Sequence, residues 1–197
     1  MADKPEEQDD FDNSKWSFDL KKLHAHLDGD TEADVIIKGH LYVEHVLIET
    51  LREALARPAL LNIERLNFPA KAELCAAMNL IPEDALRPVK YVNAMRNKIA
   101  HDLEFAVGTK EKLEFFKLFP KMGQELIRED KKPGQSKDPG SINLGHYFMV
   151  LAIIMDCFRL RYIEQKKKRE EAYENAKRVL DLFKEDSEGE SSDEETR

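Results

Sequence analysis

Residues 91–105 read Tyr91-Val-Asn-Ala-Met-Arg-Asn-Lys-Ile-Ala-His-Asp-Leu-Glu-Phe105, and the rest of the chain is arranged around this stretch. At about 100° per residue, its aliphatic side chains fall on one flank of a helix. Asn97 and His101 lie one turn apart on the polar face. Arg96 falls at the edge of the apolar flank, where a guanidinium must reach solvent or find a partner. The stretch therefore predicts a helix that packs one flank into a core and ends near His101.

The composition favours an all-helical protein with one domain. A chain of 197 residues is long enough for one domain with a sizeable core and terminal tails. Hydrophobic residues make up 42% of the chain, as in globular proteins, and 36% charged residues with only 8 Gly and 8 Pro favour long, solvated helices. The predicted fold class is all-α, a helical bundle of about five to six helices with a long C-terminal helix.

Acidic residues are concentrated at both ends of the chain. Of the net charge of −8, residues 1–13 contribute −5, from six acids and one lysine, and residues 185–197 contribute −6, from seven acids and one arginine. The segment 14–184 therefore carries +3. We interpret the ends as a disordered acidic leader and a disordered acidic tail, and 14–184 as a single helical domain. A mildly basic body is compatible with RNA as a ligand, although dedicated nucleic-acid binders are usually more basic.

The N-terminal half is expected to hold a docked arm followed by a long helix. Ser14 or Asn13 can cap a short helix that ends near Leu27. A second capped start opens a long helix over residues 31–56, with apolar residues at helical spacing. Gly39 costs this helix about 1 kcal/mol relative to alanine, so it predicts a close helix crossing.

The C-terminal half is expected to hold two further long helices. The first covers residues 109–127 and is predicted to break at Pro120. The second covers residues 141–184, and its segment 147–158 is apolar nearly all round, which predicts burial in the core. Beyond Ile163 the same helix becomes strongly charged with a thin apolar stripe. This part is interpreted as an amphipathic extension, for a partner chain or for docking back.

The cysteines and the apolar runs indicate a cytoplasmic protein without a membrane segment. Cys75 and Cys157 lie in apolar helical patterns without CxxC spacing, so both are predicted to be buried, reduced thiols. The first residues are acidic, unlike a signal peptide. The longest uncharged run is 141–155, and its apolar core reaches about half a membrane span.

Two further patterns have alternative interpretations. His40 and Glu44 lie one turn apart on the predicted helix 31–56, but they lack the His-Glu-x-x-His spacing, so no metal site is predicted. The basic run Lys166–Arg169 is either a solvated helix face or an edge that contacts phosphate. No Gly-rich phosphate loop is recognisable.

The segment Arg96-Asn-Lys-Ile-Ala-His101 resembles the motif of the HEPN superfamily, which is an arginine followed after four to six residues by a histidine. The polar residue directly after the arginine is also common there. The segment Phe68-Pro-Ala-Lys-Ala-Glu-Leu-Cys-Ala-Ala-Met-Asn-Leu-Ile81 resembles the one that precedes the motif in mannitol-operon-repressor-like members. The resemblance covers roughly residues 35–105, and a HEPN-like core is expected at about 31–165.

The resemblance implies a helical homodimer in which two copies of the motif face each other across a cleft. In active members this arrangement is a metal-independent endoribonuclease of the toxin or defence type, which needs no cofactor. On this interpretation His101 exchanges a proton with a ribose 2′-hydroxyl or with the leaving oxygen, because imidazole titrates near neutral pH. Arg96 holds the phosphate, and Asn97 orients either group. Cleavage is expected to leave a 2′,3′-cyclic phosphate.

The alternative function is a non-catalytic regulator or interaction module, similar to mannitol-operon-repressor-like proteins. It would bind a protein partner through the long C-terminal helix and the acidic tail. The enzyme is favoured by the complete motif, with Arg96, Asn97 and His101 all present. The interaction module is favoured by the net negative charge of the chain. Arg96 and His101 are about 140° apart on an ideal helix. They converge only if the helix frays near His101, if the arginine reaches around, or if the histidine comes from another chain.

Overall fold

The computed structural model describes four segments of the chain, residues 13–29, 31–102, 104–129 and 138–191. The chain divides into two compact units, residues 1–160 and residues 161–197, and each is described by itself. The predicted leader up to residue 12 and the last part of the predicted tail, residues 192–197, lie outside the described residues.

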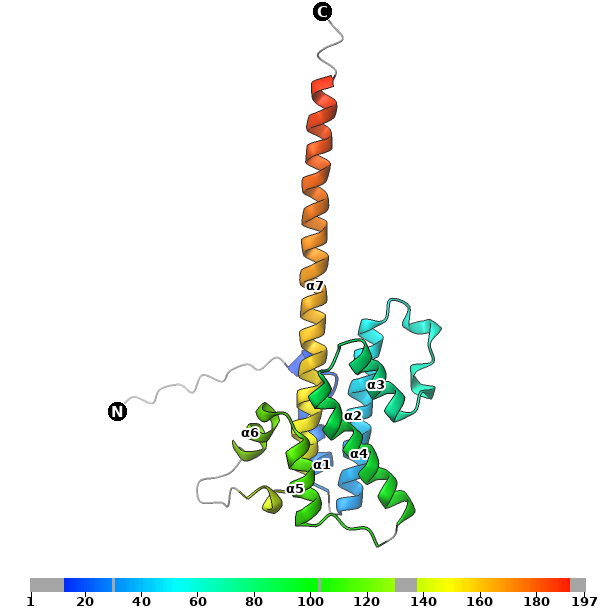
Figure 1. Cartoon of the computed structure of the whole chain (residues 1–197), viewed down its shortest axis with the longest axis vertical. Helices are drawn as coiled ribbons and strands as arrows, with labels where there is room; N and C mark the ends of the chain where they lie inside the picture. Colours follow the sequence, from blue (N-terminus) through cyan, green and yellow to red (C-terminus); the bar gives the residue numbers. More distant parts are fainter. Residues whose placement is uncertain (1–12, 30, 103, 130–137, 192–197) are drawn as a thin grey trace, which may run out of the picture. The chain divides into compact units, whose positions relative to one another are not determined.

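The all-helical prediction is confirmed, and the described residues contain no strand. The α-helices are α1 (Leu20–Leu27), α2 (Glu32–Ala54), α3 (Phe68–Ala77), α4 (Glu83–His101), α5 (Thr109–Leu118), α6 (Lys121–Glu129) and α7 (Leu144–Ser191) (Figure 1). Short 3-10 turns occur at Asn13–Lys15, Pro58–Leu60, Ile63–Arg65 and Pro139–Ser141. The described residues hold seven α-helices, one or two more than the expected five to six, and the predicted break of helix 109–127 at Pro120 is confirmed.

Local capping explains where the first helices begin. The side chain of Thr31 accepts the backbone N–H of Asp34 at 3.2 Å and caps α2 as predicted. Helix α1 begins later than expected from a cap at Asn13 or Ser14. Asp19 caps it instead, because its carboxylate accepts the N–H groups of the next turn. This contact, together with the nearby lysines, lowers the pKa of Asp19.

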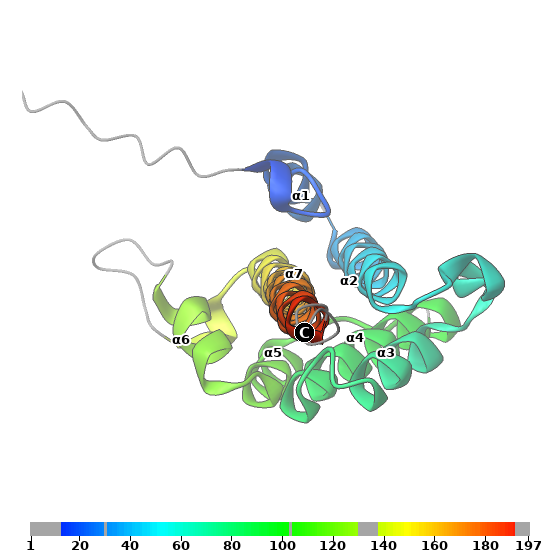
Figure 2. The same ribbon diagram turned by 90° about the horizontal axis from the view of Figure 1, so that it is seen from above.

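The first turns of α7 form the centre of the core of the first unit. Figure 2 shows α1, α2, α4, α5 and α6 arranged around them. The buried residues in these turns are Tyr147, Phe148, Val150, Leu151, Ala152, Ile154 and Met155. Phe115 of α5 stacks on Tyr147 at 5.6 Å between ring centroids and also contacts Phe148. The prediction that segment 147–158 is packed in the core is therefore confirmed for most of its length.

Two glycines allow α7 to approach its neighbours closely. A Cβ atom at Gly39 of α2 would lie 2.2 Å from Cδ1 of Phe148. A Cβ atom at Gly145 would lie 2.0 Å from the carbonyl oxygen of Leu27 in α1. Both distances are far inside van der Waals contact, so only glycine fits either crossing without movement. The predicted close crossing at Gly39 is confirmed.

The replacement Gly39→Ala is expected to lower the free energy of unfolding by about 1–3 kcal/mol. The methyl group displaces the fully buried ring of Phe148, and this strain outweighs a gain in helix propensity of about 1 kcal/mol. Chemical denaturation of wild type and variant measures the difference. The matched control is the same replacement in a Phe148→Ala background, where the clash is gone and Gly39→Ala is expected to be neutral or stabilising. A loss of equal size in both backgrounds would contradict the crossing.

A buried ion pair holds the N-terminal arm against the core. Asp156 is fully buried, and its Oδ1 accepts a hydrogen bond of 2.5 Å from Nε of Arg159. Its Oδ2 accepts the backbone N–H of Ser17 at 2.9 Å. Arg159 donates from Nη2 to the carbonyl oxygen of Lys15 at 2.7 Å. The arm is therefore docked, as predicted, through its backbone groups.

The two cysteines differ in exposure, which corrects one prediction. Cys75 is buried, and burial raises the pKa of its thiol to about 12. Cys157, predicted to be buried, is exposed. The apolar surface of α7 does not extend around the whole helix at this turn, so the thiol faces outward. Among the described residues, no helix is both long and apolar enough to span a bilayer.

The second unit consists of the later turns of α7, and its side chains are described as far as residue 181. Most of them are exposed, and ion pairs at helical spacing connect some of them, such as Lys168 with Glu164 at 2.6 Å. Tyr173, Val179 and Leu180 are also exposed, at 69%, 50% and 61%. Helix α7 continues to Ser191, past residue 185, where the acidic tail was predicted to begin.

Candidate functional site

Helix α4 carries the predicted site residues on its exposed side. The apolar flank of the helix is buried through Val89, Val92 and Met95, as the periodicity predicts. Arg96 and Asn97 are exposed next to this flank. The packing of one flank therefore fixes the direction in which the polar face points.

Arg96 and Asn97 lie together at a cleft between α2, the start of α3 and α4. The cleft has a volume of about 480 Å³. Nη1 of Arg96 donates to Oδ1 of Asn97 at 3.4 Å. Arg96 forms no ion pair with any carboxylate of the described residues. Its positive charge is therefore available to an anionic ligand.

His101 does not line this cleft. Helix α4 stays α-helical through His101, and the N–H of Asp102 donates to the carbonyl oxygen of Lys98 at 2.8 Å. The helix end therefore does not fray in the way that would turn His101 towards Arg96. His101 is exposed at the terminus of α4. Within one chain the structure brings Arg96 and Asn97 together and leaves His101 apart.

The cleft also contains His40, for which the sequence pattern indicated only a weak metal signal. His40 of α2 is 8% exposed, and its ring stacks on Phe68 of α3 at 4.2 Å between centroids and an interplanar angle of 28°. Nε2 of His40 is buried without a hydrogen-bond partner among the described residues. Asn93, one turn before Asn97, also lines the cleft. Its position on the polar face of α4 was the only sequence signal for this part of the site.

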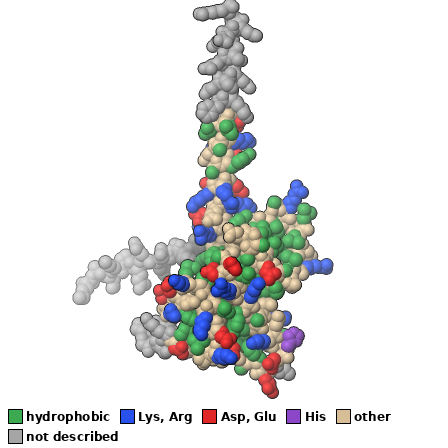
Figure 3. Space-filling view, in the orientation of Figure 1, with side chains coloured by type: hydrophobic (Ala, Val, Ile, Leu, Met, Phe, Trp, Pro, Cys, Tyr) green, Lys and Arg blue, Asp and Glu red, His purple; other side chains and the backbone are tan. Residues whose placement is uncertain are grey.

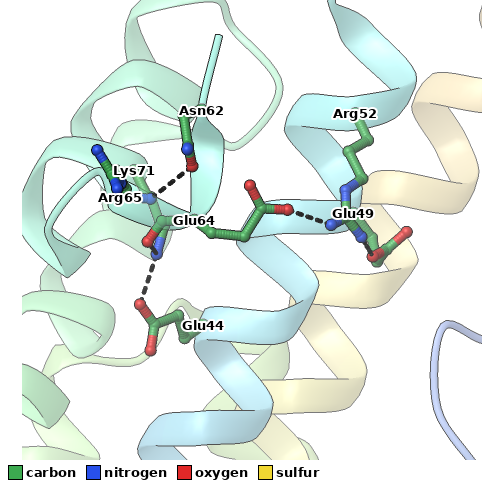
Figure 4. A network of polar contacts seen from close by, with 7 residues as sticks. All are labelled: Glu44, Glu49, Arg52, Asn62, Glu64, Arg65 and Lys71. Atoms are coloured by element: carbon green, nitrogen blue, oxygen red, sulfur yellow. Dashed lines mark hydrogen bonds and ion pairs between the residues drawn. The ribbon is translucent and has the colours of Figure 1, made fainter. Parts of the chain in front are cut away.

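The negative charge of Glu44, which lines the cleft, is balanced by an ion pair with a buried lysine. Nζ of Lys71, which is 1% exposed, lies 2.6 Å from Oε1 of Glu44 (Figure 4). The same Nζ donates to the carbonyl oxygen of Glu64 at 3.4 Å. The Glu64 side chain in turn pairs with Arg52 of α2. Lys71 offsets the charge of Glu44, so Arg96 is left as the net charge at the cleft.

Burial lowers the pKa of His40 below its ordinary value of 6.5. Glu44 and the nearby amide of Asn93 act in the opposite direction, and the positive charges of Arg96 and Lys71 act with burial. The burial effect is the largest of these. His40 is therefore neutral near pH 7 and can offer either a donor or an acceptor at Nε2.

Because the folded pKa of His40 is lowered, the protein is expected to lose stability as the pH falls below about 6.5. The unfolded chain binds this proton first, so the contribution is fully present above that pH and decreases as the pH falls towards the folded pKa. Denaturant unfolding between pH 7.5 and 5.5 measures it, compared with His40→Phe, which keeps a ring beside Phe68 but does not titrate. In His40→Phe the free energy of unfolding is expected to depend less steeply on pH than in wild type. In the control His24→Gln, which replaces an exposed histidine, the pH dependence is expected to equal that of wild type. Equal slopes in wild type and His40→Phe would contradict the assignment.

The described residues contain no group of three or more His, Cys, Asp or Glu side chains placed to hold a metal ion. His40 and Glu44 are near each other, but the carboxylate of Glu44 forms an ion pair with Lys71. The chain matches no family model, no curated protein and no solved structure. The chemistry of the site is therefore argued from its own geometry and from the motif on α4.

Charged side chains of both signs are mixed on the surface of the first unit. On the face seen in Figure 3, Lys and Arg alternate with Asp and Glu, and the described residues of this face form no continuous basic surface. Long tracks of phosphate contacts need such a surface. The described part of this face offers no such surface.

Proposed function

We propose that the protein is a metal-independent endoribonuclease of the HEPN type, with a composite site made by two copies of the chain. The observation that carries the proposal is Arg96, an exposed arginine without a carboxylate partner among the described residues, beside Asn97 at the wall of a cleft. His101 lies further along the same helix and is also exposed. These are the groups that RNA cleavage without a metal requires, namely a cation for the phosphate and an imidazole for the protons.

The proposed reaction is an attack of the ribose 2′-oxygen on the adjacent phosphorus. His101 accepts the proton of the 2′-hydroxyl, or donates one to the departing 5′-oxygen, and water exchanges the other proton. Arg96 binds the non-bridging oxygens and stabilises the charge that develops on them. A bond forms between the 2′-oxygen and phosphorus, and the bond from phosphorus to the 5′-oxygen breaks. The products are a 2′,3′-cyclic phosphate and a 5′-hydroxyl end.

A second copy of the chain is part of the proposal because of the geometry of α4. Arg96 and His101 differ by five positions on an intact helix, so their side chains diverge by about 140° and their Cα atoms by about 7.5 Å along the axis. On this undistorted helix one chain brings them together only if the long arginine side chain reaches around, whereas a second chain needs no such reach. Two chains whose α4 helices face each other across a two-fold axis would place Arg96 of one opposite His101 of the other.

The test is incubation of the purified protein with end-labelled RNA in EDTA. Wild type is expected to cleave single-stranded RNA and to leave 2′,3′-cyclic phosphate ends, identified by their resistance to direct 3′-ligation. Arg96→Ala and His101→Ala remove exposed side chains, so both variants should remain folded, and both are expected to lose cleavage. Intact RNA with wild type at concentrations that maintain a dimer would refute the proposal. Equal cleavage by wild type and His101→Ala would identify a contaminating nuclease.

The second candidate function is an interaction module. The observation that favours it is the exposure of Tyr173, Val179 and Leu180 on the later turns of α7. An apolar stripe on a charged helix is typical of partner recognition. It predicts that Tyr173→Ser and Leu180→Ser abolish binding of a protein partner while RNA remains intact in every assay.

A further inference from the structure

The inner wall of the cleft between α2, α3 and α4 offers an unused hydrogen-bonding group. His40 is more than nine-tenths buried, and Nε2 faces no hydrogen-bond partner among the described residues. Buried polar atoms in folded proteins are nearly always paired, so an exception requires a reason. Phe68 stacks on the ring and holds its orientation. The ring of His40 lines the cleft and so lies close to a ligand that enters it.

The outer part of the cleft is suited to an anionic group. Arg96 and Asn97 lie there, and the pair of Lys71 with Glu44 removes the charge of the nearest carboxylate. Helix α3 begins at the same cleft, with Asn67 as its cap. The positive end of the helix dipole adds to the field of Arg96. A phosphate at this position would be held by a guanidinium and an amide.

Exposed apolar side chains also line the cleft. Ile37 and Leu41, one turn apart on α2, are 47% and 56% exposed and line the cleft. Pro69 lies on the α3 side. These side chains offer a flat ring a surface to pack against. The cleft thus combines an exposed cation and amide, exposed apolar side chains and a buried imidazole.

We propose that this cleft binds one nucleotide of the RNA, with the phosphate at Arg96 and Asn97 and the base edge at His40 and Asn93. The inference rests on the proposed function and names the part of that site that selects the substrate. The volume of about 480 Å³ is within the range of small-molecule sites, about 300–1,000 Å³. A neutral imidazole and an amide can each donate or accept, so together they can distinguish one base edge from another.

The test is calorimetric binding of the four nucleoside 5′-monophosphates to the full chain in EDTA, with ribose 5-phosphate and inorganic phosphate as comparators. At least one nucleotide is expected to bind about tenfold or more tightly than ribose 5-phosphate, because the base adds ring packing and edge hydrogen bonds. His40→Phe is expected to weaken that nucleotide about tenfold and to leave ribose 5-phosphate unchanged. Arg96→Ala is expected to weaken the binding of both the nucleotide and ribose 5-phosphate. Lys90→Ala removes a lysine of α4 outside the cleft and is expected to weaken neither.

A second measurement protects the test against a misfolded variant. In wild type, the ring nitrogen signals of His40 are followed by NMR during the titration and are expected to shift, whereas those of His24 stay in place. Nucleotides that bind no better than ribose 5-phosphate, or a His40 signal that does not move, would overturn the inference. The outcome is separable from the proposed function. Nucleotide binding without RNA cleavage would refute the nuclease and support the nucleotide site in the cleft. RNA cleavage without nucleotide binding would support the nuclease and refute the nucleotide site.

Discussion

Replacement of Asp156 by alanine is expected to lower the free energy of unfolding by about 3–5 kcal/mol. Asp156 is fully buried, and it is the carboxylate that pairs with Arg159, which is only 6% exposed. Its removal leaves a buried guanidinium without that charge partner and the N–H of Ser17 without its acceptor. Both costs fall on the folded state alone, so stability should fall sharply.

Chemical denaturation measures this loss, and the single tryptophan of the chain, Trp16, reports on the arm. Release of the arm should change the fluorescence of Trp16 at denaturant concentrations where the helices persist. The matched control is Glu164→Ala, which removes an exposed ion pair from the same helix and should change stability by no more than about 0.5 kcal/mol. A loss of less than about 1 kcal/mol for Asp156→Ala would contradict the role assigned to the pair.

The second large effect concerns the chemistry. If His101 transfers the protons of the cleavage step, His101→Ala is expected to lower the cleavage rate by about 10²–10⁴-fold, the usual contribution of a general acid or base. Because the side chain is exposed, stability should change by less than about 0.5 kcal/mol. A large loss of activity with an unchanged fold separates a catalytic from a structural role.

The matched control for this prediction is His24→Ala, which removes an exposed histidine from α1. It is expected to leave the cleavage rate at the wild-type value. A similar loss of activity in both variants would point to a general effect of histidine removal and against a role for His101 in proton transfer.

Much of the fold follows from local sequence signals. The helix over 31–56, the break at Pro120 and the buried segment 147–158 were predictable because each depends on periodicity or on one backbone constraint. Gly39 is a similar case, since a glycine inside a long helix indicates a close neighbour. The exposed Cys157 was missed because periodicity does not show which side of an apolar helix its neighbours leave uncovered.

The candidate site was predictable only in part. Arg96 and Asn97 belong to a short motif on one helix, so the sequence alone places them together. The inner cleft joins His40, Phe68 and Asn93, which come from three helices and have no common spacing. Only tertiary packing brings them together, and a single histidine on a long helix is ordinarily a core or surface residue. The same packing leaves His101 outside the residues that line the cleft of its own chain.

The composite site is tested most directly by mixing two inactive chains. Arg96→Ala and His101→Ala are each prepared alone, mixed in equal amounts under conditions that allow subunits to exchange, and assayed on labelled RNA in EDTA. About half of the dimers are then mixed, and each of these contains one complete pair of Arg96 and His101, so the proposal predicts recovery to about one quarter of the wild-type rate. A mixture that stays as inactive as either variant alone would contradict a site shared between two chains.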